Sequence, residues 1–312
     1  MRLPKVSIII PAYNEEKNIE DVLRSATNLD YPKEKLEIIL VDDGSTDKTL
    51  EKAKKYKIKI LRGKHEGVGV SRNLGWKRSN GDLVFFLDAD QKIDRGFLRK
   101  MVPYFSDSKI AAVDCAEEME NKDKIIARMH YLKTVLGIRQ YDFPFAKLCR
   151  KLVLKELGGI NPEYGYYDDW EFTYRILKNG HRIVRNPNAI VYHNQPENFN
   201  EVWRQNRWSG RSIIFLFKNY KMQMVRKLLF PIICAPIPLY ILFLFLPPFF
   251  KFIGILGISV FLLMETMRVF RMFMITKMFE SVLTPIFDVI TMDLYSIGII
   301  IGLLNSKKTP KA

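Results

Sequence analysis

The pair Asp88 and Asp90 is the sharpest chemical feature of this 312-residue sequence, because it follows directly on the apolar run Leu83–Leu87. In an extended strand, residues i and i+2 point to the same side, so two carboxylates at this spacing can grip one cation. Divalent cations such as Mg²⁺ and Mn²⁺ prefer oxygen ligands and keep positions open for phosphate oxygens. We therefore predict that Asp88 and Asp90 bind Mg²⁺ or Mn²⁺.

Two more polar clusters follow apolar runs in the same way. The segment 11–15 (Pro-Ala-Tyr-Asn-Glu) follows Val6–Ile10, and Asp42 and Asp43 follow the run that begins at Leu36. A single Asp at a strand end is commonly a turn or helix-capping residue. Three polar clusters at the ends of three strands of one sheet instead predict a single acidic crevice.

A glycine-rich segment, Gly67–Gly75, opens a predicted helix and contains Gly69 and Arg72. Glycines let backbone N–H groups approach a phosphate, and the N-terminal end of a helix favours an anion. Arg72 adds a fixed cation with bidentate geometry. The same glycines are equally consistent with close helix packing, so the phosphate-binding interpretation depends on the neighbouring motifs.

The elements expected to position these residues alternate regularly over residues 1–115. Apolar, β-branched runs predict strands at Val6–Ile10, Leu36–Val41, Ile58–Leu61, Leu83–Leu87 and Ile110–Val113. Amphipathic segments between them predict helices near Glu15–Thr27, Thr46–Tyr56, Val68–Ser79 and Arg95–Phe105. Apolar strands joined by helices predict a doubly wound, mostly parallel α/β sheet, whose ligands lie beyond the carboxyl ends of the strands.

The following segment, 116–220, is less regular. It contains a predicted helix at Asp168–Lys178, a strand at Ile183–Tyr192 interrupted at Asn186-Pro187, and a basic, aromatic helix at Asn198–Lys218. His193 follows the predicted strand, which is consistent with either a site residue or, as is commoner for a lone His, a structural one.

Composition narrows the class of protein. Apolar residues make up 48% of the chain, which excludes a mainly disordered protein. The three cysteines have no close spacing, which excludes a disulfide scaffold and a thiolate zinc site. The formal net charge of +15 suits a polyanionic partner. Because the positive charge is spread along the chain and no nucleic-acid-binding motif is present, we expect no nucleic-acid partner.

Long apolar runs predict membrane-anchoring helices within 221–312. Leu228–Phe250 has 23 residues without a charge and Phe252–Met264 adds 13, whereas a span needs about 20. The stretch Glu265–Met278 is suited to lie at the membrane interface, and Ile286–Leu304 is either a third span or a re-entrant segment. Because Lys and Arg flank the first two runs, we predict a multi-pass protein of the cell membrane whose catalytic part faces the cytoplasm.

Four motifs in order, Pro11–Glu15, Val41–Asp47, Ser71–Asn73 and Phe86–Asp90, resemble those of the family 2 glycosyltransferases with the GT-A fold. The resemblance is dense over residues 5–105 and looser to about 215. It implies an inverting enzyme with a nucleotide-sugar donor, in which Asp88 contacts ribose and Asp90 binds the metal bridging the diphosphate. The residues that it assigns to donor binding are Pro11, Ala12, Tyr13, Glu15, Asp42, Asp43, Gly69, Arg72 and Asp88.

Two later elements carry the same resemblance. Asp168-Asp169 is similar to the Glu-Asp element that supplies the base in inverting members, with Asp168 replacing the Glu and Asp169 retained as the base. The alternative is an acidic first helical turn, and the two roles can coexist. Arg207-Trp208 resembles the end of the Gln-x-x-Arg-Trp motif of processive synthases, although Gln205 lies one residue late. The motif implies that Asp168, Arg207 and Trp208 lie near the acceptor or the diphosphate; a helix resting on lipid headgroups is the alternative.

We therefore expect a GT-A domain over 1–220, with a nucleotide-sugar-binding half (1–115) and an acceptor-binding half (116–220), followed by membrane-anchoring helices over 221–312. A carboxylate base favours a hydroxyl acceptor, because a phosphate acceptor is already ionised. The leading hypothesis is a membrane-bound inverting glycosyltransferase that moves a sugar, from a UDP-sugar in the simplest case, to a hydroxyl of a lipid-linked or nascent glycan. The alternatives are a polyprenyl phosphate sugar synthase, a processive polysaccharide synthase and a non-catalytic nucleotide sensor.

Overall fold

The computed structural model describes residues 3–139, 144–219, 241 and 243–276, together with 281, 283, 285–287, 291, 297, 299 and 301. The chain divides into two compact units. The described residues of the first unit are 3–120 and 144–194, and those of the second are 121–139 and the ones from 195 onward. The expected division at residue 220 stays a prediction.

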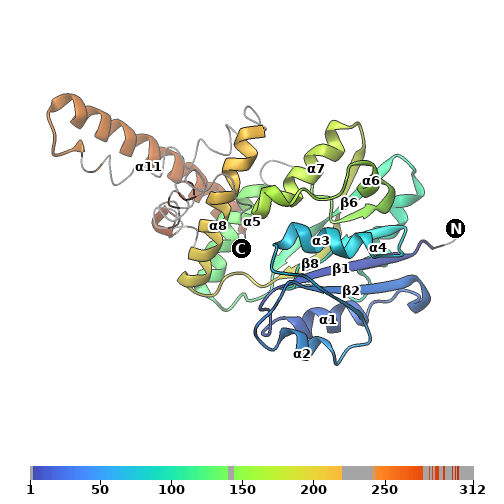
Figure 1. Ribbon diagram of the computed structural model, residues 1–312. Helices are drawn as coiled ribbons and strands as arrows, with labels where there is room; N and C mark the ends of the chain where they lie inside the picture. The colour runs from blue at the N-terminus through green and yellow to red at the C-terminus, as the bar shows by residue number, and fades with distance from the viewer. Residues whose placement is uncertain are drawn as a thin grey trace. The chain divides into compact units, whose positions relative to one another are not determined.

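The first unit is built on one mixed sheet of eight strands (Figure 1). The strands are β1 Val6–Ala12, β2 Leu36–Asp42, β3 Lys59–Arg62, β4 Leu83–Phe86, β5 Gln91–Ile93, β6 Ile110–Met119, β7 Leu148–Arg150 and β8 Arg182–His193. Their order across the sheet is β3-β2-β1-β4-β7-β6-β8-β5. Strands β3, β2, β1 and β4 run parallel, as do β6 and β8, whereas β7 and β5 are antiparallel to their neighbours.

Helices cover both faces of this sheet, and the alternation of side chains in β1 shows how. Ile8 and Ile10 belong to one apolar cluster and Ile9 belongs to the other, because successive strand residues point to opposite faces. Figure 1 shows α1 and α2 below the sheet and α3, α6 and α7 above it. The helices of this unit are α1 Ile19–Thr27, α2 Thr49–Ala53, α3 Val68–Lys77, α4 Phe97–Met101, α6 Lys151–Glu156 and α7 Asp168–Lys178. Short 3₁₀ helices lie at Lys33–Lys35, Val102–Ser106 and Pro162–Tyr167.

The α/β class is confirmed, with two differences from the expected topology. The run of parallel strands holds through β4, but β6 does not continue it, because β7 lies between β4 and β6 and is antiparallel to both. The strand β8 is continuous across Asn186-Pro187. Its register with β6 shifts from the pair Cys115–Asn186 to the pair Ala116–Ile190, so the residues between loop out and absorb the proline.

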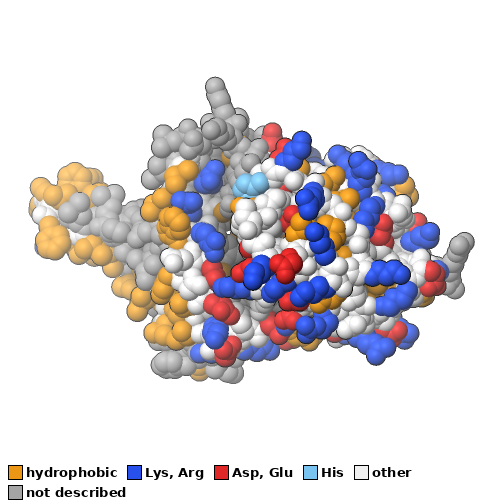
Figure 2. All heavy atoms as spheres, turned by 60° about the horizontal axis from the view of Figure 1, so that its bottom comes forward, with side chains coloured by type: hydrophobic (Ala, Val, Ile, Leu, Met, Phe, Trp, Pro, Cys, Tyr) orange, Lys and Arg blue, Asp and Glu red, His pale blue; other side chains and the backbone are white. Residues whose placement is uncertain are grey.

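The second unit contains α5 Ile125–Arg139, α8 Phe199–Asn219 and α11 Pro248–Thr276. Within the described residues, α11 is the one helix long and apolar enough to cross a membrane, over Pro248–Met267. Large apolar side chains on it are exposed, and hydrophobic atoms crowd this helix in Figure 2. The helix continues without a break into the stretch expected at the membrane interface. Most of the other two expected spans, 228–250 and 286–304, lies outside the described residues.

Candidate active site

The two carboxylates of the Asp88-Ala-Asp90 motif lie on a turn and not on a strand face. Strand β4 ends at Phe86 and β5 begins at Gln91, so the expected argument from strand alternation is wrong. The Gln91 N–H donates to the Asp88 carbonyl (3.0 Å), which closes the turn. The two side chains accordingly have different partners: Asp88 contacts Arg72, and Asp90 contacts His193.

His193 connects two carboxylates at the end of β8. Its Nε2 lies 3.2 Å from Asp90 Oδ2, and its Nδ1 lies 2.7 Å from Glu117 Oε1. The Asn194 N–H also donates to the Asp90 carbonyl (3.0 Å), which fixes the motif against this strand end. Burial favours the neutral ring, but Asp90 and Glu117 outweigh it and raise the pKa of His193 well above its usual value.

A divalent cation fits Asp90 on chemical grounds. The Asp90 Oδ1 atom is buried and has no hydrogen-bond partner within the described residues. No group of three or more His, Cys, Asp or Glu side chains in that part of the chain is arranged to hold a metal ion. Mg²⁺ is commonly held by only one or two carboxylates plus substrate phosphates, so Asp90 with Asp88 is a sufficient protein contribution.

Arg72 on α3 joins the Asp88 turn to the start of α7. Its Nη2 donates to Asp88 Oδ1 (2.6 Å), and its Nη1 donates to Asp168 Oδ1. Burial would raise the pKa of Asp88, but Arg72 and then Lys147 lower it to about 2. Asp168 behaves differently: burial, together with the nearby charges of Asp169 and Asp88, raises its pKa despite Arg72. Its Oδ2 has no hydrogen-bond partner among the described residues.

Close packing of α3 explains why Arg72 is held so firmly. The neighbouring Asn73 donates from Nδ2 to the Ile160 carbonyl (2.6 Å) and accepts from the Ile160 N–H (3.0 Å). A Cβ at Gly69 would come within 2.9 Å of Pro162 Cα. Gly69 therefore permits close helix packing, which is the alternative that the sequence left open for these glycines. The position of Gly69 in the donor-binding set stays a prediction.

Loss of the Arg72 side chain is expected to destabilise the fold. The Arg72→Ala variant leaves two carboxylates, Asp88 and Asp168, without their shared cation, and such a loss costs about 3–5 kcal/mol. The free energy of unfolding, measured by urea denaturation of detergent-solubilised protein, should fall by about that amount. Lys77→Ala, at an exposed position of the same helix, should change it by less than about 0.5 kcal/mol. Equal stability of the two variants would contradict a structural role for the pair.

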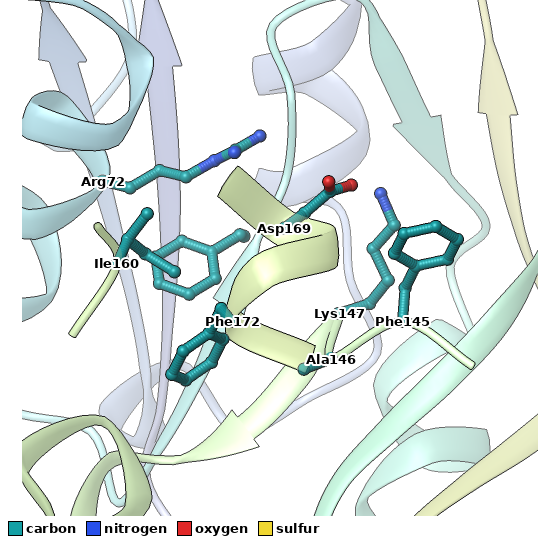
Figure 3. A pocket seen from close by; sticks show the side chains of 8 residues that line it. Arg72, Phe145, Ala146, Lys147, Ile160, Asp169 and Phe172 are labelled. Atoms are coloured by element: carbon teal, nitrogen blue, oxygen red, sulfur yellow. The ribbon is translucent and has the colours of Figure 1, made fainter. Parts of the chain in front are cut away.

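Asp169 lines an open pocket of about 330 Å³. In Figure 3 its carboxylate and the Lys147 ammonium point toward the same space, into which the Arg72 guanidinium also extends. The Trp170 N–H donates to Asp169 Oδ1 (2.6 Å), so the carboxylate is held at the first turn of α7. The other lining residues are Phe86, Phe145, Ala146, Ile160 and Phe172. The arrangement places a carboxylate and two cations around one small space.

Some of the residues expected to hold a nucleotide have side chains available for a ligand, and others are used in hydrogen bonds that hold the fold together. Tyr13 is exposed and its ring stacks on His65, with the ring centroids 4.1 Å apart. Burial, then Asp90, raises the pKa of Glu15 to about 7. Asp43 is instead committed to the fold, because it accepts from the Glu66 N–H (3.1 Å) and the Gly67 N–H (2.8 Å).

Asp42 is also buried, but its carboxylate has fewer backbone partners. It accepts from the Ser45 N–H at 3.3 Å. Pro11 and Ala12 are buried residues at the end of β1, and the Asp43 N–H donates to the Ala12 carbonyl (2.8 Å). The ends of β1 and β2 are therefore joined where the acidic residues emerge.

Arg207 and Trp208 lie on α8, in the second unit. The Arg207 guanidinium stacks over the Trp203 ring at 4.3 Å. Their expected roles at the acceptor or diphosphate stay predictions.

Two residues of the site were not assigned from the sequence. Lys147 belongs to a segment without a regular pattern, so no motif indicated it. His193 was left between a site residue and a structural one, although it ends an apolar strand as Asp42 does. Position at a strand end is the signal that could have identified His193.

Comparison with known proteins gives a family match over the part of the chain that contains strands β1 to β7. The Glycosyl transferase family 2 profile matches residues 7–156. The probable glycosyltransferase YdaM of Bacillus subtilis (strain 168) is 33% identical over 257 residues, which cover 72% of this chain and 60% of YdaM. The poly(ribitol-phosphate) beta-N-acetylglucosaminyltransferase TarS of Staphylococcus aureus (strain Mu50 / ATCC 700699) is 36% identical over 225 residues, which cover 64% of this chain and 39% of TarS. The chain thus spans less than two thirds of either relative.

Solved structures share the fold. The mannosyltransferase PcManGT from Pyrobaculum calidifontis, in complex with GDP-Man and Mn²⁺, has a TM-score of 0.59 at 18% identity and covers 98% of this chain and 88% of its own. S. aureus TarS 1-349, in complex with UDP-GlcNAc, has a TM-score of 0.52 at 23% identity and covers 67% and 66%. These likenesses establish a GT-A type of fold. The profile match, together with the YdaM and TarS relatives, identifies a glycosyl transferase family 2 domain over residues 7–156 of this chain.

Proposed function

We propose that the chain is an inverting glycosyltransferase that moves a sugar from a nucleotide-sugar donor to an acceptor hydroxyl. The observation that carries this proposal is the pocket in which Asp169 faces Arg72 and Lys147 (Figure 3). The pocket sets a carboxylate that can take a proton from an acceptor hydroxyl beside two cations. The acidic residues at the ends of β1, β2 and β4 provide the remaining contacts that a nucleotide requires.

The donor is proposed to bind along these strand ends. Tyr13 offers an exposed ring for the base, and Asp42 and Glu15 are acceptors for base N–H or ribose hydroxyl groups. Asp42 is favoured over Asp43, since both Asp43 oxygens already accept backbone N–H groups. The UDP-GlcNAc and GDP-Man of the solved neighbours support a nucleotide-sugar donor, and TarS, the closer of the two in sequence, favours a UDP-sugar.

Asp90 is proposed to hold a divalent cation, with Asp88 as its companion. The Mn²⁺ of PcManGT supports this assignment. When bound, such a cation neutralises the charge that develops on the leaving nucleoside diphosphate. Asp88 is already fully ionised, because Arg72 and Lys147 lower its pKa to about 2. It therefore needs no proton loss before it can bind a metal or accept from ribose.

Asp169 is proposed as the general base. The acceptor oxygen attacks the anomeric carbon as the bond from that carbon to the diphosphate oxygen breaks. The hydroxyl proton passes to an Asp169 oxygen, and the bonding electrons leave with the diphosphate. One displacement from the opposite side inverts the configuration of the anomeric carbon.

Membrane attachment is proposed for the part of the chain after residue 220. The exposed apolar side chains of α11 over Pro248–Met267 support at least one span. An anchored enzyme meets a lipid-linked or nascent glycan at the bilayer surface. Further spans, and a catalytic unit on the cytoplasmic side, are proposed from the apolar runs of the sequence and their basic flanks.

A phosphate acceptor is the second candidate. Lys147 and Arg72 beside Asp169 favour it, because a polyprenyl phosphate needs cations and no base.

The test supplies UDP-GlcNAc or GDP-Man with Mn²⁺ and either an alkyl glycoside or a polyprenyl phosphate, and follows the product by NMR. The proposal expects an inverted product on the glycoside hydroxyl. Transfer to the phosphate alone would select the second candidate, and a retained configuration would contradict both.

A further inference from the structure

Lys147 is a cation that the roles described so far leave without an assigned task. Its side chain is largely buried and lines the same pocket as Arg72 and Asp169. In Figure 3 it enters the pocket from the segment before β7, whereas Arg72 enters from α3. Arg72 is committed to Asp88 and Asp168. Lys147, by contrast, makes no side-chain hydrogen bond or ion pair with any residue in the described part of the chain.

Three carboxylates nevertheless surround Lys147 at longer range. Burial would lower the pKa of Lys147, but Asp88, Glu117 and Asp169, in that order, outweigh burial and raise it above its usual value. The ammonium is therefore charged at neutral pH. A buried charge without a direct partner is costly to maintain. An anion that enters the pocket would give it that partner.

The backbone around Lys147 fixes where its side chain starts. The Phe86 N–H donates to the Lys147 carbonyl (3.2 Å), which joins this segment to the end of β4, two residues before Asp88. The adjacent Ala146 N–H donates to Thr173 Oγ1 (3.0 Å) on α7, in a buried contact. Lys147 is thereby positioned against both the Asp88 turn and the helix that carries Asp169. Such preorganisation is typical of groups that stabilise charge in a reaction.

We propose that Lys147 binds the diphosphate of the donor and stabilises it as the leaving group, because it is the cation without an ion pair among the described residues that line the pocket. The inference rests on the proposed function and extends it to a residue outside the recognised motifs. The diphosphate is favoured over an acceptor phosphate because Lys147 adjoins the Asp88 turn, where the donor is proposed to lie. The glycosidic oxygen gains negative charge as its bond to the sugar breaks, so a neighbouring ammonium lowers the barrier.

The test compares the Lys147→Gln variant with the wild-type full chain in detergent, using UDP, uridine and geranyl monophosphate as probes in the presence of Mn²⁺. UDP and geranyl monophosphate are followed by calorimetry, and uridine by NMR titration. Removal of a charge-assisted hydrogen bond should weaken UDP binding about 10- to 100-fold. Uridine affinity should not change, which also reports that the variant is folded. Lys147→Arg should keep most of the UDP affinity.

Lys155→Gln is the matched control. It removes the same charge from an exposed position on α6 and should leave UDP affinity unchanged. Equal UDP affinity in Lys147→Gln and wild type would overturn the inference while leaving the proposed function intact. Weaker binding of geranyl monophosphate alone would overturn it in favour of an acceptor phosphate. Wild-type protein that binds none of UDP, GDP, CDP and dTDP would instead remove the proposed function, and the inference with it.

Discussion

Replacing Asp169 with Asn is expected to lower the rate of sugar transfer about 10²- to 10⁴-fold, the usual contribution of a general base. The amide has the same shape as the carboxylate and cannot take a proton from the acceptor hydroxyl. Donor affinity should persist, because the residues proposed to hold the nucleotide lie at the ends of β1, β2 and β4, and Asp169 lies at the start of α7. Single-turnover kinetics and calorimetry of the same preparation measure the two quantities separately.

Glu163→Gln is the matched control for this substitution. Glu163 is exposed in the 3₁₀ segment just before α7, and the change also converts a carboxylate to an amide. Its transfer rate should equal that of the wild type. If Asp169→Asn transferred sugar at a nearly normal rate, the base assignment would be wrong and a phosphate acceptor would become the better explanation.

Replacing Asp90 with Ala is expected to abolish the metal-dependent part of turnover. The change removes the buried Oδ1, which has no partner among the described residues, and the Oδ2 that contacts His193. Mn²⁺ should no longer strengthen nucleoside diphosphate binding, so affinities with Mn²⁺ and with EDTA should become equal. Asp21→Ala, at an exposed position on α1, should leave the Mn²⁺ effect intact. A full Mn²⁺ effect in Asp90→Ala would show that Asp90 is not a metal ligand.

The strand-end motifs could be predicted from the sequence because local pattern and tertiary position agree there. In β1 every residue is buried, and the apolar run Val6–Ile10 is unmistakable. The same reasoning correctly located the start and end of α7 at Asp168–Lys178. A parallel sheet then requires the residues after such strands to emerge at one edge, so the pattern alone predicts where the acidic residues gather.

The missed elements are those whose stability comes from distant parts of the chain. Strands β5 and β7 have three residues each, too few to show a period, and form because β8, β4 and β6 offer open edges. The position of Lys147 depends on the pairing of β7 with β4 and on the hydrogen bond from the adjacent Ala146 to Thr173. Both contacts join distant parts of the chain, so no local pattern could indicate Lys147. The turn at Asp88–Asp90 also depends on a distant part of the chain, because β5, which follows the turn directly, is paired with β8.

Asp42 and Asp43 show where residue type is insufficient. Both carboxylates follow the same strand, yet one reaches the backbone of residues 66 and 67 and the other does not. The difference arises from the loop before α3, where a Cβ at Gly63 would lie 2.5 Å from Asp43 Oδ1. Only the packing of that loop distinguishes a structural Asp from a candidate ligand.

The central claim, that the strand-end crevice binds a nucleotide-sugar donor, is tested most directly by calorimetric titration of detergent-solubilised protein with UDP, GDP, CDP and dTDP, each with Mn²⁺ and with EDTA. We predict that one nucleoside diphosphate binds clearly more tightly than the others, and that its affinity depends on Mn²⁺. Absence of binding by all four nucleotides would contradict the account, because the acidic residues at the ends of β1, β2 and β4 would then not form a donor site.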